Sequence, residues 1–261
     1  MLKNILRFGQ RKFEGRVGFV YVPDDETGPM RRPQKGRVVR VEGRGPPWIV
    51  VDDTLDSIIL TKWPGTLWKV AVVEAATVDD QARAGGPPIS YVRYIRCISV
   101  EILENEDPTV LFGEHGQAIV TILNRAAALT HEQAIRLSSN RHRDASDAYD
   151  RAFSRWLDFK YRSGHLDGAL QVDWTRATSP VNGGLNLIYS TVLARATAVD
   201  GAKATVVDED GDQDLVEPWA GAAAVLTDAG MALGAPSLVA AEDRGILLAG
   251  WAVQDGGRHE L

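Results

Sequence analysis

The segment from Ala145 to Leu157 constrains the fold most strongly, because its apolar residues recur with the period of an α-helix. The apolar positions are Ala145, Ala148, Tyr149, Ala152, Phe153, Trp156 and Leu157. Charged residues fill the other face, where Asp147 and Arg151 have the i, i+4 spacing of a helical ion pair. The pattern predicts an amphipathic helix whose apolar stripe packs against a helical core.

The chain before this helix has short β-branched and aromatic runs separated by Gly, Pro and Asp, a pattern typical of strands. The runs cover residues 17–22, 38–41, 48–51, 58–63, 67–73 and 89–103. The last run is apolar on both faces, which predicts a central strand. We expect an α+β fold: an antiparallel β-meander or small barrel over 1–107, then a helix-rich half over 108–261 that contains one β-hairpin. The sequence leaves open whether these parts form one continuous domain.

Local motifs add four detailed predictions. Pro64-Gly65 is a turn pair that would form a hairpin, with Trp63 and Trp68 on one face. Residues 76–88, polar and with paired Gly and Pro, are predicted to form a long loop or an insertion. Thr130 and Gln133 have the spacing of a capping box at the start of a helix. Asp210-Gly211 is a hairpin turn signal.

Composition limits the cellular setting. No apolar run approaches the roughly 20 residues of a membrane helix, so no membrane partner is expected. The first 13 residues lack the apolar core of a secretory signal, and Cys97 is the single cysteine of the 261-residue chain. We therefore expect a cytoplasmic protein without disulfides, and a buried, structural Cys97.

Charge is distributed unevenly along the chain. Residues 1–45 hold 11 Lys and Arg against 5 Asp and Glu, whereas the remainder holds 18 against 30, within a net charge of −6. Opposite charge on two parts of one chain predicts either an interaction surface or docking of the parts on each other.

An acidic cluster around the predicted hairpin turn is the first candidate binding site. It consists of Asp208, Glu209, Asp210, Asp212 and Asp214. The alternating carboxylates imitate the start of a calcium-binding loop. However, Gln213 and Trp219 stand where that loop requires Gly and Glu, so no metal site is predicted.

Two further candidates are a basic segment and a histidine at a helix start. Arg31, Arg32, Lys35 and Arg37 could neutralise several phosphates. Glu114 and His115 precede a helix, where backbone N–H groups favour anions, and they are weak candidates for acid–base chemistry. No nucleophile or second carboxylate stands beside them, and no motif predicts a cofactor.

Three functions follow from these candidates. The first is a non-catalytic protein-binding module, of the bacterial immunity or antitoxin type, that binds a basic partner through its acidic residues. The second is a nucleic-acid-binding regulator that uses the basic segment. The third is a small-molecule enzyme with a site near His115. The sequence favours the first, and an enzyme is the less favoured reading.

Overall fold

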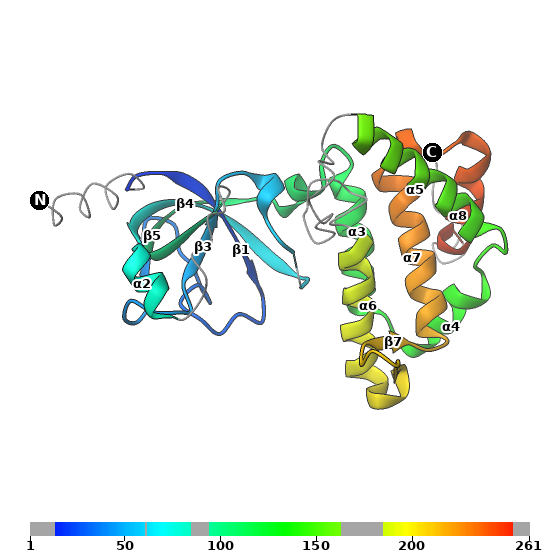
Figure 1. The fold of residues 1–261 in the computed structure, drawn as a ribbon. Helices are drawn as coiled ribbons and strands as arrows, with labels where there is room; N and C mark the ends of the chain where they lie inside the picture. The colour runs from blue at the N-terminus through cyan, green and yellow to red at the C-terminus, as the bar shows by residue number, and fades with distance from the viewer. Residues whose placement is uncertain (1–13, 61, 85–93, 163–184, 253–261) are drawn as a thin grey trace, which may run out of the picture. The chain divides into compact units, whose positions relative to one another are not determined.

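The computed structural model describes residues 14–60, 62–84, 94–162 and 185–252, and it has the predicted α+β architecture (Figure 1). A β-rich part precedes a helix-rich part that contains one small β-hairpin. Within the described residues, no helix is long and apolar enough to cross a membrane.

The chain divides into two compact units, which we call the barrel unit and the helical unit. The barrel unit comprises Met1–Ile58 and Gly65–Pro108, and the helical unit comprises Ile59–Pro64 and Thr109–Leu261. The main division lies between Pro108 and Thr109, while the short segment Ile59–Pro64 also belongs to the helical unit.

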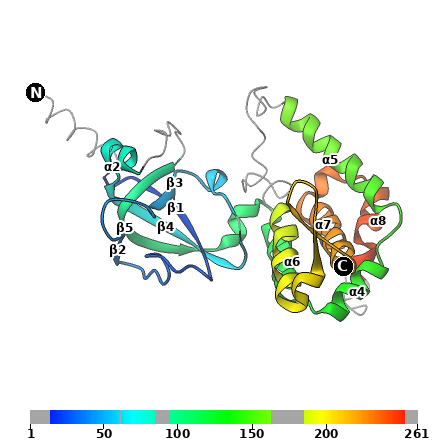
Figure 2. The same ribbon diagram turned by 60° about the horizontal axis from the view of Figure 1, so that its bottom comes forward.

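The barrel unit is built from a five-stranded antiparallel sheet. Its strands are β1 (Val17–Pro23), β2 (Val38–Arg40), β3 (Ile49–Asp52), β4 (Gly65–Ala75) and β5 (Tyr94–Glu106). Strand β5 pairs with β3 and with β4, and β1 pairs with the same two strands, which closes a small barrel (Figure 2). Strand β2 pairs with β5 and adds an edge to this barrel.

Burial along β5 confirms the predicted central strand. Cys97, Ile98, Ser99 and Val100 are consecutive and fully buried, so the strand is covered on both faces. The buried, structural role predicted for Cys97 is also confirmed, because its thiol lies in the apolar barrel core. Burial disfavours the thiolate and raises the pKa of Cys97 to about 12.

The predicted Trp63–Trp68 hairpin is wrong. Strand β4 begins at Gly65 and pairs with β1, where Trp68 faces Val20 across the ladder. Trp63 lies in the helical unit instead, where its indole N–H donates to Asn124 at 2.9 Å and its ring meets Phe112 edge-on. Strand β4 instead forms a long ladder with β1, which supplies many cross-strand contacts. Trp63 is stabilised separately by its aromatic contact with Phe112.

The loop predicted for residues 76–88 is wrong in part, because it contains the short helix α2 (Val78–Arg83). The Thr77 hydroxyl accepts the Asp80 N–H, and the Asp80 carboxylate accepts the Thr77 N–H, which is a capping box. This threonine and aspartate, three residues apart, were the sequence signal for the helix. Residues 85–88 lie outside the described part of the chain.

The helical unit packs its elements around α7. Its helices are α3 (Gly116–Ala128), α4 (His131–Ser139), α5 (Ala145–Arg162), α6 (Leu185–Asp200), α7 (Trp219–Gly234) and α8 (Ala241–Ala252), with short 3-10 turns at Pro108–Phe112, Gly201–Ala204 and Pro236–Leu238. Helix α7 is buried along most of its length and contacts α3, α4, α6 and α8 (Figure 1). Its small residues permit this close packing.

Helix α5 confirms the amphipathic prediction, since Ala145, Ala148, Ala152 and Trp156 are buried. The predicted ion pair within this helix is replaced by a tertiary one: the guanidinium of Arg151 forms two hydrogen bonds with the buried carboxylate of Asp243 on α8. A bidentate, partly buried pair is stronger than an exposed i, i+4 pair.

Candidate functional site

The predicted acidic hairpin forms between α6 and α7, where β6 (Thr205–Val207) pairs with β7 (Gln213–Leu215). The carboxylate of Asp208 accepts the backbone N–H groups of Asp210 and Asp212 at 2.9 and 2.8 Å. Gly211 has a φ of +87°, a conformation that glycine adopts without strain. Local residues therefore fix the turn, and Asp208 has a structural role within it.

The hairpin presents a mixed acidic and apolar surface. The side chains of Asp208, Glu209, Asp210, Asp212 and Asp214 are all exposed. Val206 and Val207 are also exposed, at 52% and 60%, and Val206 lies directly across the ladder from Asp214. Carboxylates beside exposed apolar side chains can both attract a basic surface and bury apolar area against it.

Three side chains join the ends of α4, α6 and α7, the last two of which precede and follow the hairpin in the chain. The Asp200 carboxylate, at the end of α6, accepts the indole N–H of Trp219 at 2.6 Å, and the same oxygen lies 2.5 Å from Nδ1 of His131. Trp219 is buried and stands at the start of α7. The hydrogen bond from Trp219 and then the one from His131 lower the pKa of Asp200. Sequence reasoning missed this cluster because no local motif links residues 131, 200 and 219.

The hairpin turn yields a first prediction. Gly211→Ala should destabilise the hairpin by about 1 kcal/mol, because an L-residue is strained at this positive φ. Amide hydrogen exchange should show faster exchange at Asp212 while the amides of α7 are unchanged. The control is Gly245→Ala, whose added methyl group meets no atom within 4 Å. Equal exchange rates of the hairpin amides in both variants would contradict the role of Gly211 in the turn.

The basic segment forms one loop of the barrel unit. Arg31, Arg32, Lys35 and Arg37 are exposed, and none of them has an acidic side chain within ion-pair distance among the described residues. The structure places these four predicted residues on a different unit from the acidic hairpin.

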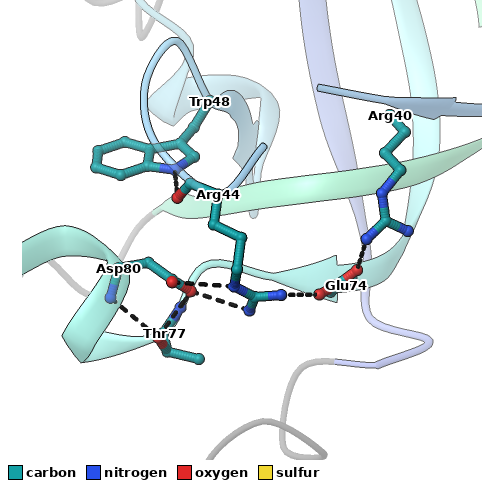
Figure 3. Close-up of polar contacts among 6 residues, drawn as sticks. All are labelled: Arg40, Arg44, Trp48, Glu74, Thr77 and Asp80. Carbon is teal, nitrogen blue, oxygen red and sulfur yellow. Dashed lines mark hydrogen bonds and ion pairs between the residues drawn. The ribbon is translucent and has the colours of Figure 1, made fainter. Parts of the chain in front are cut away.

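Two arginines that follow the basic segment in the chain, Arg40 and Arg44, are neutralised by acidic residues (Figure 3). Arg44 forms hydrogen bonds to both carboxylate oxygens of Asp80, each at 3.0 Å, and to Glu74 at 2.7 Å. Arg40 donates to the second oxygen of Glu74 at 2.6 Å. The indole N–H of Trp48 donates to the Arg44 carbonyl oxygen. These ion pairs dock part of the basic N-terminal segment on acidic residues of the same barrel unit. Docking of oppositely charged parts was one of the two explanations of the charge asymmetry that the sequence raised.

Asp80 is the buried centre of this network. Burial alone would raise the pKa of its carboxyl group, but hydrogen bonds from Arg44 and Thr77 outweigh that effect and lower the pKa to about 2. Its carboxylate accepts from Arg44 and from the backbone and hydroxyl of Thr77. These bonds fasten the loop that carries Arg44 to the start of α2.

Glu114 and His115 lie where the sequence places them, directly before α3. Both are exposed, and His115 precedes the helix without a side-chain capping bond. Among the described residues, neither side chain has a hydrogen bond or ion pair. The enzyme hypothesis stays a prediction.

The described residues contain no group of three or more His, Cys, Asp or Glu side chains that could hold a metal ion. The acidic hairpin is among these residues, and the Asp208 carboxylate in it accepts backbone N–H groups. No protein-family model matches the chain, and no curated protein or solved structure is detectably similar to it.

Proposed function

We propose that this protein is a protein-binding module that docks a basic partner on its β6–β7 hairpin, in the manner of a bacterial immunity or antitoxin-like inhibitor. The observation that carries the proposal is the exposed side chain of Val206, which shares a face of the hairpin with Asp214 across the ladder and lies among further exposed carboxylates. Charged groups at the edge of an interface steer the partner, and apolar groups at its centre supply area to bury.

The anchoring of the hairpin also supports the proposal. Its strands are joined at one end by the turn that Asp208 stabilises, and at the other the Val216 N–H donates to the Ala204 carbonyl. The helices on either side of it in the chain, α6 and α7, are linked by Asp200 and Trp219. The N–H of Leu215 in β7 donates to the Tyr189 hydroxyl of α6. A hairpin that is already ordered has less conformational entropy to lose when it binds a partner.

The test is an affinity capture from nuclease-treated lysate of the native organism at low and moderate salt. The variant Asp210→Asn, Asp212→Asn, Asp214→Asn removes three carboxylates and keeps Asp208, which the turn requires. We expect the unchanged chain to retain a basic protein and the variant to retain at least tenfold less of it, equivalent to about 1.4 kcal/mol or more.

A control variant removes the same charge elsewhere. Asp147→Asn, Asp150→Asn, Asp158→Asn changes three exposed carboxylates of α5 and should leave capture unchanged. Equal losses in both variants would indicate general electrostatics rather than a hairpin site. Retention of the same partner by the hairpin variant, or capture of acidic proteins alone, would refute the proposed function.

A further inference from the structure

The described cations of residues 14–45 fall into two groups. Arg16, Arg40 and Arg44 each have a carboxylate partner, at distances of 2.6 to 3.0 Å. Arg31, Arg32, Lys35 and Arg37 have none among the described residues. These four unpaired cations lie close together within residues 28–37, which we call the basic loop. Its charge is available for an external partner.

The backbone of the basic loop is fixed at several points. Met30 is buried in the barrel core, and the Arg31 N–H donates to the Gly28 carbonyl at 3.1 Å. At the far end, Gly36 and Arg37 pair with Ile102 of β5 through hydrogen bonds of 2.7 and 2.8 Å. The four cationic side chains therefore project from an ordered backbone, which lowers the entropic cost of binding.

Two acidic residues that precede the loop do not neutralise it. Asp24 and Glu26 follow the end of β1, and the Glu26 carboxylate accepts the N–H of Gly28. Neither of the two forms an ion pair with a basic side chain of the loop among the described residues. Acidic groups farther away are screened beyond about 8 Å at physiological salt, so the local cations dominate here.

We propose that the basic loop binds the phosphodiester backbone of a nucleic acid. Three of its four cations are arginines, whose planar guanidinium groups match phosphate oxygens in a bidentate geometry. Several cations within a few residues can contact successive phosphates and release their counterions. This inference is independent of the proposed protein-binding function, since it uses other residues on the other unit.

The test is fluorescence anisotropy of short labelled nucleic acids, duplex DNA and single-stranded RNA, titrated with the full chain between about 50 and 200 mM salt. Four phosphate contacts on duplex DNA predict a slope of about −3.6 in log K against log salt, a loss of affinity on the order of 100-fold over this range. Binding of either probe with such a dependence is the expected result.

The decisive variant is Arg31→Ala, Arg32→Ala, Lys35→Ala, Arg37→Ala. These side chains are exposed, so the circular dichroism spectrum and melting temperature should be unchanged. The affinity at about 50 mM salt should fall on the order of 100-fold, and the salt slope should approach zero. The control changes four other exposed arginines, Arg83, Arg136, Arg143 and Arg244, to alanine and should bind nearly as well as the unchanged chain.

Three results would overturn this inference. The first is the absence of nucleic-acid binding by the unchanged chain at about 50 mM salt, where backbone contacts are strong. The second is an equal loss of affinity in the control variant. The third is that vesicles containing phosphatidylserine, tested in parallel, bind the basic loop while neither nucleic acid does.

Discussion

Gly116→Ala should destabilise the helical unit by about 3 kcal/mol. A methyl group at Gly116 would lie 1.9 Å from the carbonyl oxygen of Thr109, and a backbone atom cannot move aside as a flexible side chain can. Gly116 is the first residue of α3, so the collision would displace the start of a helix whose inner face is buried. Denaturant unfolding of the full chain measures the effect.

The matched control for this prediction is Gly245→Ala in α8, where the added methyl group meets no atom within 4 Å. Alanine is the better helix former, so this change should be neutral or stabilising by up to about 1 kcal/mol. A separate transition of the barrel unit, if resolved, should be the same in both variants. Equal stability of the two variants would contradict the close approach of Gly116 to Thr109.

Asp80→Ala should destabilise the barrel unit by about 3 kcal/mol. The change removes the acceptor for Arg44 and for the Thr77 N–H, and it opens a small cavity where the carboxylate is 3% exposed. The adjacent Asp79 is exposed, so Asp79→Ala should cost less than about 0.5 kcal/mol. Similar losses in the two variants, measured by thermal and denaturant unfolding, would rule out a special role for Asp80.

The low pKa of Asp80 makes part of this stability depend on pH. A carboxyl group whose pKa is about 2 when folded and about 3.9 when unfolded stabilises the fold above pH 4. That contribution, about 2.6 kcal/mol, is lost as the pH falls through 2. The difference in unfolding free energy between the unchanged chain and Asp80→Asn should therefore shrink from pH 5 to pH 2. A difference that is constant over this range would show that the carboxylate is not stabilised in its charged form.

The sequence predicted the elements whose causes are local. The stripe of α5 follows from apolar spacing, the start of α4 from the Thr130–Gln133 capping box, and the hairpin turn from Asp210-Gly211. Each depends on residues within one or two turns of chain, where backbone conformation and neighbouring side chains decide the outcome. The acidic side chains of the hairpin and the cations of the basic loop were also predicted from the sequence, because they too lie close together in the chain.

The partners of long-range contacts came only from the tertiary structure. Trp63 and Asn124 are separated by 61 residues, Arg44 and Asp80 by 36, and Arg151 and Asp243 by 92. For an arginine, any nearby carboxylate satisfies the same chemistry, so Asp147 was as plausible a partner for Arg151 as Asp243 was.

Burial decides which of the possible carboxylates an arginine pairs with in the folded protein. Asp243 and Asp80 are buried, and a buried carboxylate must be paired and hydrogen-bonded, whereas an exposed one such as Asp147 can be left to water. The basic residues of the barrel unit differ in the same way. Arg40 and Arg44 pair with acidic residues of that unit, whereas the cations of the basic loop do not. The sequence by itself determined which residues carry charge and, apart from α2 and the hairpin predicted at Pro64-Gly65, which segments are helices or strands. Only the tertiary structure decided which charges are neutralised and which remain exposed, because that depends on packing between distant parts of the chain.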